Sequence, residues 1–248
     1  MLNSFSCYLV VPLELPSSLW GSTRSIVVDH DLAHFAGLAY GDGYPGRGEV
    51  RVVTSNSVFA DKLLGIVNQI ANVYGGTSSD YVRPGNVSDN PQRTIVLNST
   101  LVRRALFHDT MRPNYDSIYS IAMDDLLAAD IQGGLTDAEG SILLPQPIEY
   151  PHGRIFAMVN SDRRLLGISR LSLVNKLRLE PTSVSTRLSN KRGRKHTTGG
   201  LEFVTRKNSY LIEILAGAKK KWLDKVGNLL WHPDKLGRVR VLASTYNN

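Results

Sequence analysis

Apolar side chains recur at every second position in some segments and at helical spacing in others. The segments follow one another along the chain, which predicts strands interleaved with helices. Val50 and Val52 alternate with polar neighbours, as in a half-buried strand. Further on, Phe59, Leu63 and Ile66 recur at the spacing of a helix that buries one face. The elements predicted here are a strand at 49–55, a helix at 58–73, strands at 79–83 and 93–98, and a helix at 99–107.

The remainder of the chain repeats this pattern. Its predicted elements are strands at 141–144 and 154–160, a helix at 163–177, strands at 183–189 and 201–206, and a helix at 209–216. Asn160-Ser161 echoes Asn56-Ser57, and Asn208-Ser209 echoes Asn98-Ser99. We therefore predict an α+β fold of two pseudo-symmetric halves, each with the order α-β-β-α-β-β-α.

Each half opens on a glycine-rich helical segment, residues 35–43 and residues 132–140. Small residues four apart share one face of such a helix. These residues are Gly37 and Gly41 in the first segment, and Gly134 and Ala138 in the second. Glycine inside a helix costs about 1 kcal/mol relative to alanine. We expect this cost to be offset by a close approach of the two helix backbones.

Both segments end in an acid followed by glycine, Asp42-Gly43 and Glu139-Gly140. The glycines are expected to end the helices in the left-handed conformation. The acids then lie at the negative end of the helix dipole, where a carboxylate is disfavoured unless a cation accompanies it. If the helices cross near these ends, the two acids meet and form a site for a hard divalent metal.

These two segments, and the order of elements around them, resemble the LAGLIDADG homing endonucleases of the single-chain, two-motif type. The resemblance runs from about Asp29 to Ala218. It implies two four-stranded antiparallel sheets packed through the motif helices, in a molecule that acts as a monomer. Tyr40 and Gln132-Gly133 depart from the signature, but neither lies at the metal-binding position.

The resemblance also implies an activity, which is the metal-dependent cleavage of both strands of a long, non-palindromic DNA target. Asp42 and Glu139 would be the catalytic residues and the ligands of Mg²⁺, or of Mn²⁺ in its place. Family members often carry an auxiliary lysine or glutamine near these acids. In this chain Arg163 and Lys207 are the nearest basic candidates, and the sequence does not identify the residue.

The same resemblance divides the chain into five parts. They are an N-terminal extension (1–28), a first half-domain (29–108), a linker (109–120), a second half-domain (121–218) and a basic C-terminal tail (219–248).

Charge favours a nucleic-acid partner. The net charge is +7, and it is uneven, since residues 1–125 carry −3 and residues 126–248 carry +10. A basic surplus of this kind is typical of a protein that binds a polyanion. The expected partner is double-stranded DNA, with intron RNA as a second candidate. The predicted DNA-binding residues are Arg51, Arg83, Arg93, Arg154, Arg187, Lys191, Arg192, Arg194, Lys195, Arg206 and Lys207. We expect the first three of these to lie on one face of the sheet in the first half.

Other classes of protein fit the sequence less well. The single cysteine, Cys7, excludes a disulfide framework and a cysteine-based zinc site. No apolar run approaches the ~20 residues of a membrane span, and residues 7–15 lack the basic start of a secretory signal. We expect an intracellular protein, in the cytoplasm of a prokaryote or the matrix of an organelle, and not a secreted one.

Two other functions remain open on the same fold. One is an RNA-binding intron maturase, and the other is a DNA-binding protein that has lost cleavage. The presence of both acids favours the nuclease, because neither alternative requires them.

Overall fold

The computed structural model describes residues 9–12, 25–83, 91–146, 152–189, 195–198, 201–204 and 209–246. The first half is built from seven elements, which are α1 (His30–Gly41), β3 (Tyr44–Pro45), β4 (Glu49–Thr54), α2 (Ser57–Tyr74), β5 (Thr77–Arg83), β6 (Gln92–Asn98) and α3 (Thr100–Leu106). Its antiparallel sheet has the strand order β3-β4-β6-β5. The strand β3 is only two residues long, too short for an alternating pattern to reveal it.

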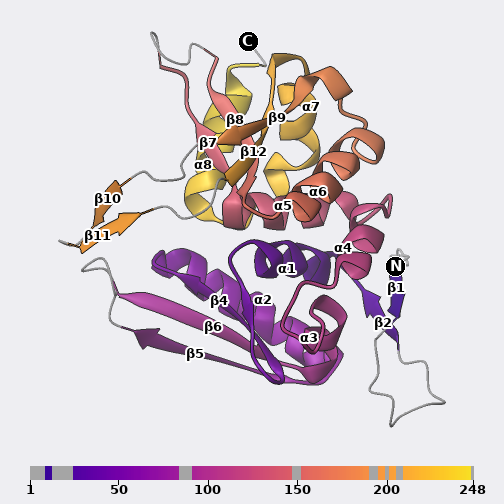
Figure 1. Ribbon diagram of the computed structural model, residues 1–248. Coiled ribbons are helices and arrows are strands. Elements are labelled where there is room, and N and C mark those ends of the chain that lie inside the picture. The colour runs from indigo at the N-terminus through magenta and orange to yellow at the C-terminus, as the bar shows by residue number, and fades with distance from the viewer. Residues whose placement is uncertain are drawn as a thin grey trace, which may run out of the picture.

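The second half contains α5 (Ala128–Glu139), β7 (Ser141–Leu143), β8 (Arg154–Asn160), α6 (Arg163–Asn175), β9 (Val184–Ser189), β12 (Ser209–Ile214) and α7 (Ala216–Lys225). Its sheet is also antiparallel and has the order β7-β8-β12-β9, the same pattern as in the first half. The fold is thus α+β with two four-stranded antiparallel sheets, as predicted. The motif helices α1 and α5 lie side by side between the two halves (Figure 1).

Two predicted elements of the second half were wrong. The strand predicted at 201–206 does not join the sheet, because β11 (Leu201–Val204) pairs with β10 (Lys195–Thr198) in a separate hairpin. The helix predicted at 209–216 is instead the strand β12, which completes the sheet. Ile212 and Ile214, two residues apart on this strand, are both buried. The echo of Asn98-Ser99 at Asn208-Ser209 is therefore not a structural equivalence.

Glycine allows the close packing of α1 against α5. A Cβ atom added to Gly134 would lie 2.0 Å from the carbonyl oxygen of His34, and one added to Gly37 would lie 2.4 Å from that of Ile131. A Cβ on Gly41 would lie 2.4 Å from the Cβ of Ala138. Backbone contacts backbone at this crossing, so the four small residues predicted for the interface all lie in it.

The glycines that follow the acids were expected to be left-handed, and this was wrong. Gly140 is extended, with φ −87°, and Gly43 is not among the described glycines with positive φ. Glycine is needed at both positions because there is no room for a side chain. An added Cβ would lie 2.6 Å from the Thr136 carbonyl oxygen at Gly140, and 2.6 Å from that of Ala39 at Gly43.

The segments outside the two halves also fold. The strands β1 (Leu9–Pro12) and β2 (Ser25–Val28) pair within the N-terminal extension, and α4 (Tyr115–Ala122) occupies part of the linker. The predicted C-terminal tail is not a tail. The turn η3 (Gly227–Leu229) and the helix α8 (Pro233–Ser244) follow α7 and pack on the second half (Figure 1). The buried side chains of this region include Trp222, Val226, Leu230, Val239 and Leu242.

Among the described residues, none of the helices is both long and apolar enough to cross a bilayer.

Candidate metal and nucleic-acid site

The packing of α1 on α5 brings the two acidic helix ends together. Asp42 is the C-cap of α1, and Glu139 is the last residue of α5. A Cβ added to Gly41, the neighbour of Asp42, would lie 2.9 Å from the Cγ atom of Glu139. The side chain of Glu139 therefore lies against the end of α1, next to Asp42, as the spacing of the two motifs predicted.

Glu139 is half-buried and Asp42 is more exposed. Partial loss of water around the two carboxyl groups raises the pKa values of both above the ordinary range. The pKa of Glu139 reaches about 7, because the nearby charge of Asp42 adds to the effect of burial. The side-chain amide of Asn160 donates a hydrogen bond of 2.8 Å to Glu139 Oε1 and acts in the opposite direction. Two carboxylates held close together in a partly buried site repel one another, and a cation relieves this repulsion.

This pair of ligands fits a magnesium ion. Within the described part of the chain, no group of three or more His, Cys, Asp or Glu residues could hold a metal, so the protein would supply two carboxylates. Mg²⁺ is usually bound by one or two carboxylates, with waters and substrate phosphates completing its six ligands. The remaining positions would then be open to water or to a phosphate oxygen.

Lys235 is a basic group whose charge acts on both Asp42 and Glu139. Its ammonium group donates to the carbonyl oxygens of Thr136, at 2.8 Å, and of Asp137, at 2.5 Å, in the last turn of α5. Burial lowers its pKa, while the charges of Asp137, Asp42 and Glu139 raise it. In turn, Lys235 lowers the pKa values of both acids.

Lys235 was not predicted as a site residue, because it lies on α8, in the segment predicted to be a tail. The two basic residues considered instead were Arg163 and Lys207. Arg163 lies over the ring of Tyr210, 5.0 Å from its centre, and Lys207 lies outside the described residues.

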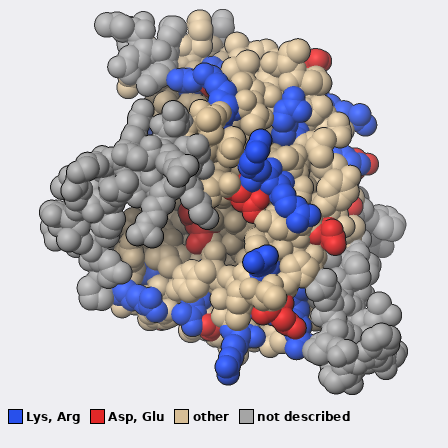
Figure 2. Space-filling view, viewed as in Figure 1, with Lys and Arg blue, Asp and Glu red and all other residues tan. Residues whose placement is uncertain are grey.

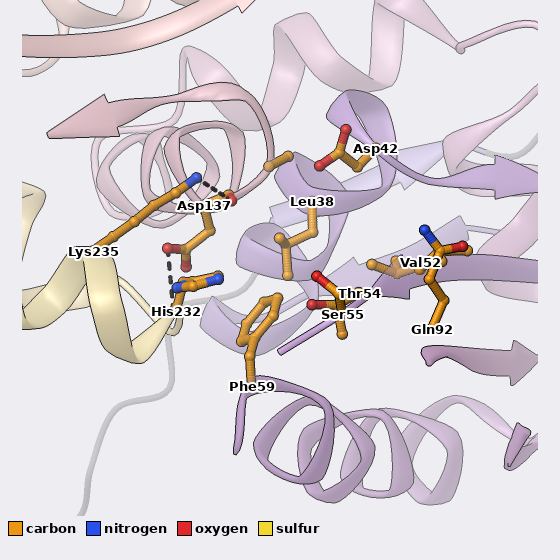
Figure 3. Close-up of a pocket in the computed structure, with 12 residues that line it drawn as sticks. Leu38, Asp42, Val52, Thr54, Ser55, Phe59, Gln92, Asp137, His232 and Lys235 are labelled. Atoms are coloured by element: carbon orange, nitrogen blue, oxygen red, sulfur yellow. Dashed lines mark hydrogen bonds between the residues drawn. The ribbon is translucent and has the colours of Figure 1, made fainter. Parts of the chain in front are cut away.

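A cavity of about 280 Å³ opens beside Asp42. It is lined by Leu38, Asp42, Val52, Val53, Thr54, Ser55, Phe59, Gln92, Asp137, Ala138, His232 and Lys235. Figure 3 shows His232 and Lys235 entering from the α8 side, while Asp42, Thr54 and Gln92 come from the first half. The cavity thus combines two acids, a lysine and neutral hydrogen-bonding groups, which suits a phosphate and a metal better than an apolar ligand.

The strand register places most of the predicted DNA-binding residues of the first half on one sheet face. Arg51 lies opposite Val96, and Arg83 lies opposite Gln92, so both belong to the face away from α2. Arg51 pairs with Glu49, and Arg83 donates to Tyr81 Oη at 2.9 Å.

Arg93 was predicted to share this face, and that was wrong. On β6 it lies on the face opposite to that of Val96, and its side chain points toward α2. There it pairs with Asp61 and with Asp80. A shift of one residue in a strand moves a side chain to the other face. The alternation of apolar and polar residues did not determine which residues of β6 face α2.

In the second half, Arg154 and Arg187 converge on one acid. Arg154 Nε donates to Glu213 Oε1 at 2.7 Å, and Arg187 pairs with the other oxygen of Glu213. Glu213 is only 5% exposed, whereas half of the Arg187 side chain is exposed. The remaining predicted contacts were Lys191, Arg192, Arg194, Arg206 and Lys207, which lie outside the described residues, and Lys195, which begins β10.

The distribution of charge on one surface agrees with a polyanion partner. Figure 2 shows a hollow between the two halves with acidic side chains at its floor, and lysine and arginine side chains on the surface above and below it. A negative centre within a basic surround fits a metal site that is approached by a phosphate backbone.

No protein-family model matches this chain, and no curated protein matches it. The interpretation of the site therefore rests on its geometry.

Proposed function

We propose that this protein is a metal-dependent DNA endonuclease of the LAGLIDADG homing type, which cuts both strands of a long duplex target. The observation that carries the proposal is the meeting of Asp42 and Glu139 at the ends of two helices packed through glycine. A structural role alone does not explain why two carboxylates lie together at the negative ends of two helices.

Each residue of the site has a part in this reaction. Asp42 and Glu139 hold Mg²⁺ or Mn²⁺, which when bound lowers the pKa of a water and stabilises charge on the leaving oxygen. Asn160 orients Glu139 through its 2.8 Å hydrogen bond. Lys235 supplies positive charge next to the acids, where the scissile phosphate gains negative charge in the transition state.

The two sheets supply the grip on DNA. Arg51 and Arg83 on one sheet, and Arg154 and Arg187 on the other, present guanidinium groups that can bind phosphates or the edges of guanine. Because the two halves carry different side chains, the target has two different half-sites. One chain contains both halves, so a monomer suffices for cleavage.

The test begins with DNA. Duplexes bound by the protein are selected from a random library and cloned into a supercoiled plasmid, which is then incubated with the protein and Mg²⁺. We expect linear product from the parent, and none from the double variant Asp42→Asn with Glu139→Gln, although that variant still binds the duplex. Asp125→Asn, an exposed acid paired with Lys176, is the matched control and should cleave normally.

Three results would contradict the proposal. The first is a double variant that still linearises the plasmid, and the second is a parent that binds structured RNA in preference to every duplex, as a maturase would. The third is a parent that binds its selected duplex and leaves both strands intact, which identifies a DNA-binding protein without cleavage.

A further inference from the structure

Asp137 is a buried acid two residues before Glu139, and both of its oxygens are occupied within the protein. Its Oδ2 atom accepts a hydrogen bond from the backbone N–H of Trp231 at 2.5 Å, and Oδ1 accepts one from that of His232 at 3.2 Å. His34 Nε2 lies 2.9 Å from Oδ2. The residue is 4% exposed, so this carboxylate binds the chain itself.

The segment that it binds, residues 230–235, is here called the strap. Besides α5, the strap contacts two helices of the first half. The Trp231 ring stacks on His34 of α1, with centres 3.8 Å apart and planes 11° apart. The His232 ring lies 4.9 Å from that of Phe59, on α2. The strap therefore lies across both halves and ends at Lys235.

This arrangement has no counterpart in the first half. When the motifs are aligned on Asp42 and Glu139, the position of Asp137 is occupied by Tyr40. The Tyr40 ring is buried and packs against Phe107, with ring centres 5.5 Å apart. The acid at this motif position thus belongs to the one half on which a strap is docked.

We propose that Asp137 is a positioning residue, which holds the strap on α5 and so places Lys235 beside Asp42 and Glu139. The inference rests on the proposed function for its catalytic consequence, but the docking itself can be tested without DNA. A lysine ammonium has three donors, and two of those on Lys235 bond to Thr136 and Asp137. The third N–H is free to bind a phosphate, and it lies beside Asp42 and Glu139 only while the strap stays docked.

The first experiment is hydrogen exchange on the full chain, comparing Asp137→Asn with Asp130→Asn. Asp130 is a matched control, because it is a buried acid of α5 that bonds to a histidine of α1, His30, at 2.7 Å without contacting the strap. In Asp137→Asn we expect the amides of Trp231 and His232 to exchange at least tenfold faster. The amides of α1 and α5 should keep their protection in both variants.

Trp231→Leu supplies a second variant, because it removes the stack on His34 without altering a charge, and it should speed the same two amides. If Asp137→Asn speeds exchange throughout α1 and α5, or if Asp130→Asn speeds the strap equally, Asp137 serves general stability and the inference is overturned.

The second experiment is a double-mutant cycle in single-turnover cleavage of the selected duplex. If Asp137 acts through Lys235, then Asp137→Asn and Lys235→Met should each slow cleavage about tenfold or more, and the double variant should be no slower than Lys235→Met. Multiplicative losses would overturn the inference. A parent that cuts no DNA would overturn the proposed function instead, and the exchange experiment would still decide whether Asp137 docks the strap.

Discussion

Glu139 carries a charge that the folded protein holds at a cost. Its pKa rises from 4.5 to about 7 through burial and the nearby Asp42, so the folded state binds this proton more tightly than the unfolded chain does. The resulting stability is fully present below pH 4.5 and is lost as the pH rises through 7. Above pH 7 the ionised site is therefore a strained one, and a bound cation relieves it.

Glu139→Gln should accordingly stabilise the metal-free protein at pH 8 and leave its stability at pH 4 unchanged. We expect a gain of about 1–2 kcal/mol, since one pKa unit corresponds to about 1.4 kcal/mol and solvent screens a partly exposed carboxylate. Thermal melts at the two pH values measure this. Mg²⁺ should raise the melting temperature of the parent at pH 8 and have little effect on the variant. Equal melts at pH 8 would show that Glu139 is not under strain.

Among the described helices, α1 and α5 are the ones in which glycine lies against backbone atoms of another helix. Gly134→Ala should destabilise the protein by about 2 kcal/mol or more, because the new methyl group overlaps backbone atoms of α1 that cannot move independently. Gly167→Ala is the control. Gly167 lies within α6, nothing lies within 4 Å of its added Cβ, and alanine there should stabilise the helix by up to about 1 kcal/mol.

Urea unfolding of the two variants measures both changes. A similar effect at the two positions would mean that the crossing of α1 and α5 tolerates a wider separation than the structure has.

The sequence predicted the elements whose periodicity is local and missed those whose identity depends on distant partners. The strands β4 and β8 and the helices α2 and α6 show clear periods, and all four were predicted within a few residues. The strand β12 was taken for a helix, since its place between β8 and β9 depends on pairing that the local sequence does not record. The hairpin of β10 and β11, which lies between β9 and β12 in the chain, made the prediction of β12 harder still.

The candidate site divides in the same way. Asp42, Glu139 and the four small residues of the helix crossing were found because two copies of one motif carry them. Lys235 was missed because nothing near it in the sequence links it to α5, whose carbonyl groups it binds. Arg93 was assigned to the wrong face because its ion pair with Asp61 of α2 became visible only in the fold.

For the whole molecule, the net charge of +7 predicts DNA binding that weakens steeply with salt. Charge removal at Lys191, Arg192, Arg194 and Lys195 together should weaken binding to all duplexes alike. It should also flatten the dependence of log affinity on log salt by about one unit per lost phosphate contact.

Arg187→Ala should behave differently, because a strand holds Arg187 in register. It should cost about 1–3 kcal/mol at one base pair and leave the salt slope nearly unchanged. Salt titrations and a panel of single-base substitutions measure both effects. If the four-residue variant alters base preference and Arg187→Ala does not, the two roles are reversed.

The strap also has a consequence for the order in which the protein folds. Its hydrogen bond from Asn56 to Asp234 joins residues separated by 178 positions, whereas His30 of α1 and Asp130 of α5 are separated by 100. Contacts between distant residues close large loops and form slowly. During refolding, α1 and α5 should therefore pack before the Trp231 ring reaches His34. A molecule at that stage has both halves folded and both acids in place, yet it lacks the lysine, so refolding chains should recover DNA binding before they recover cleavage.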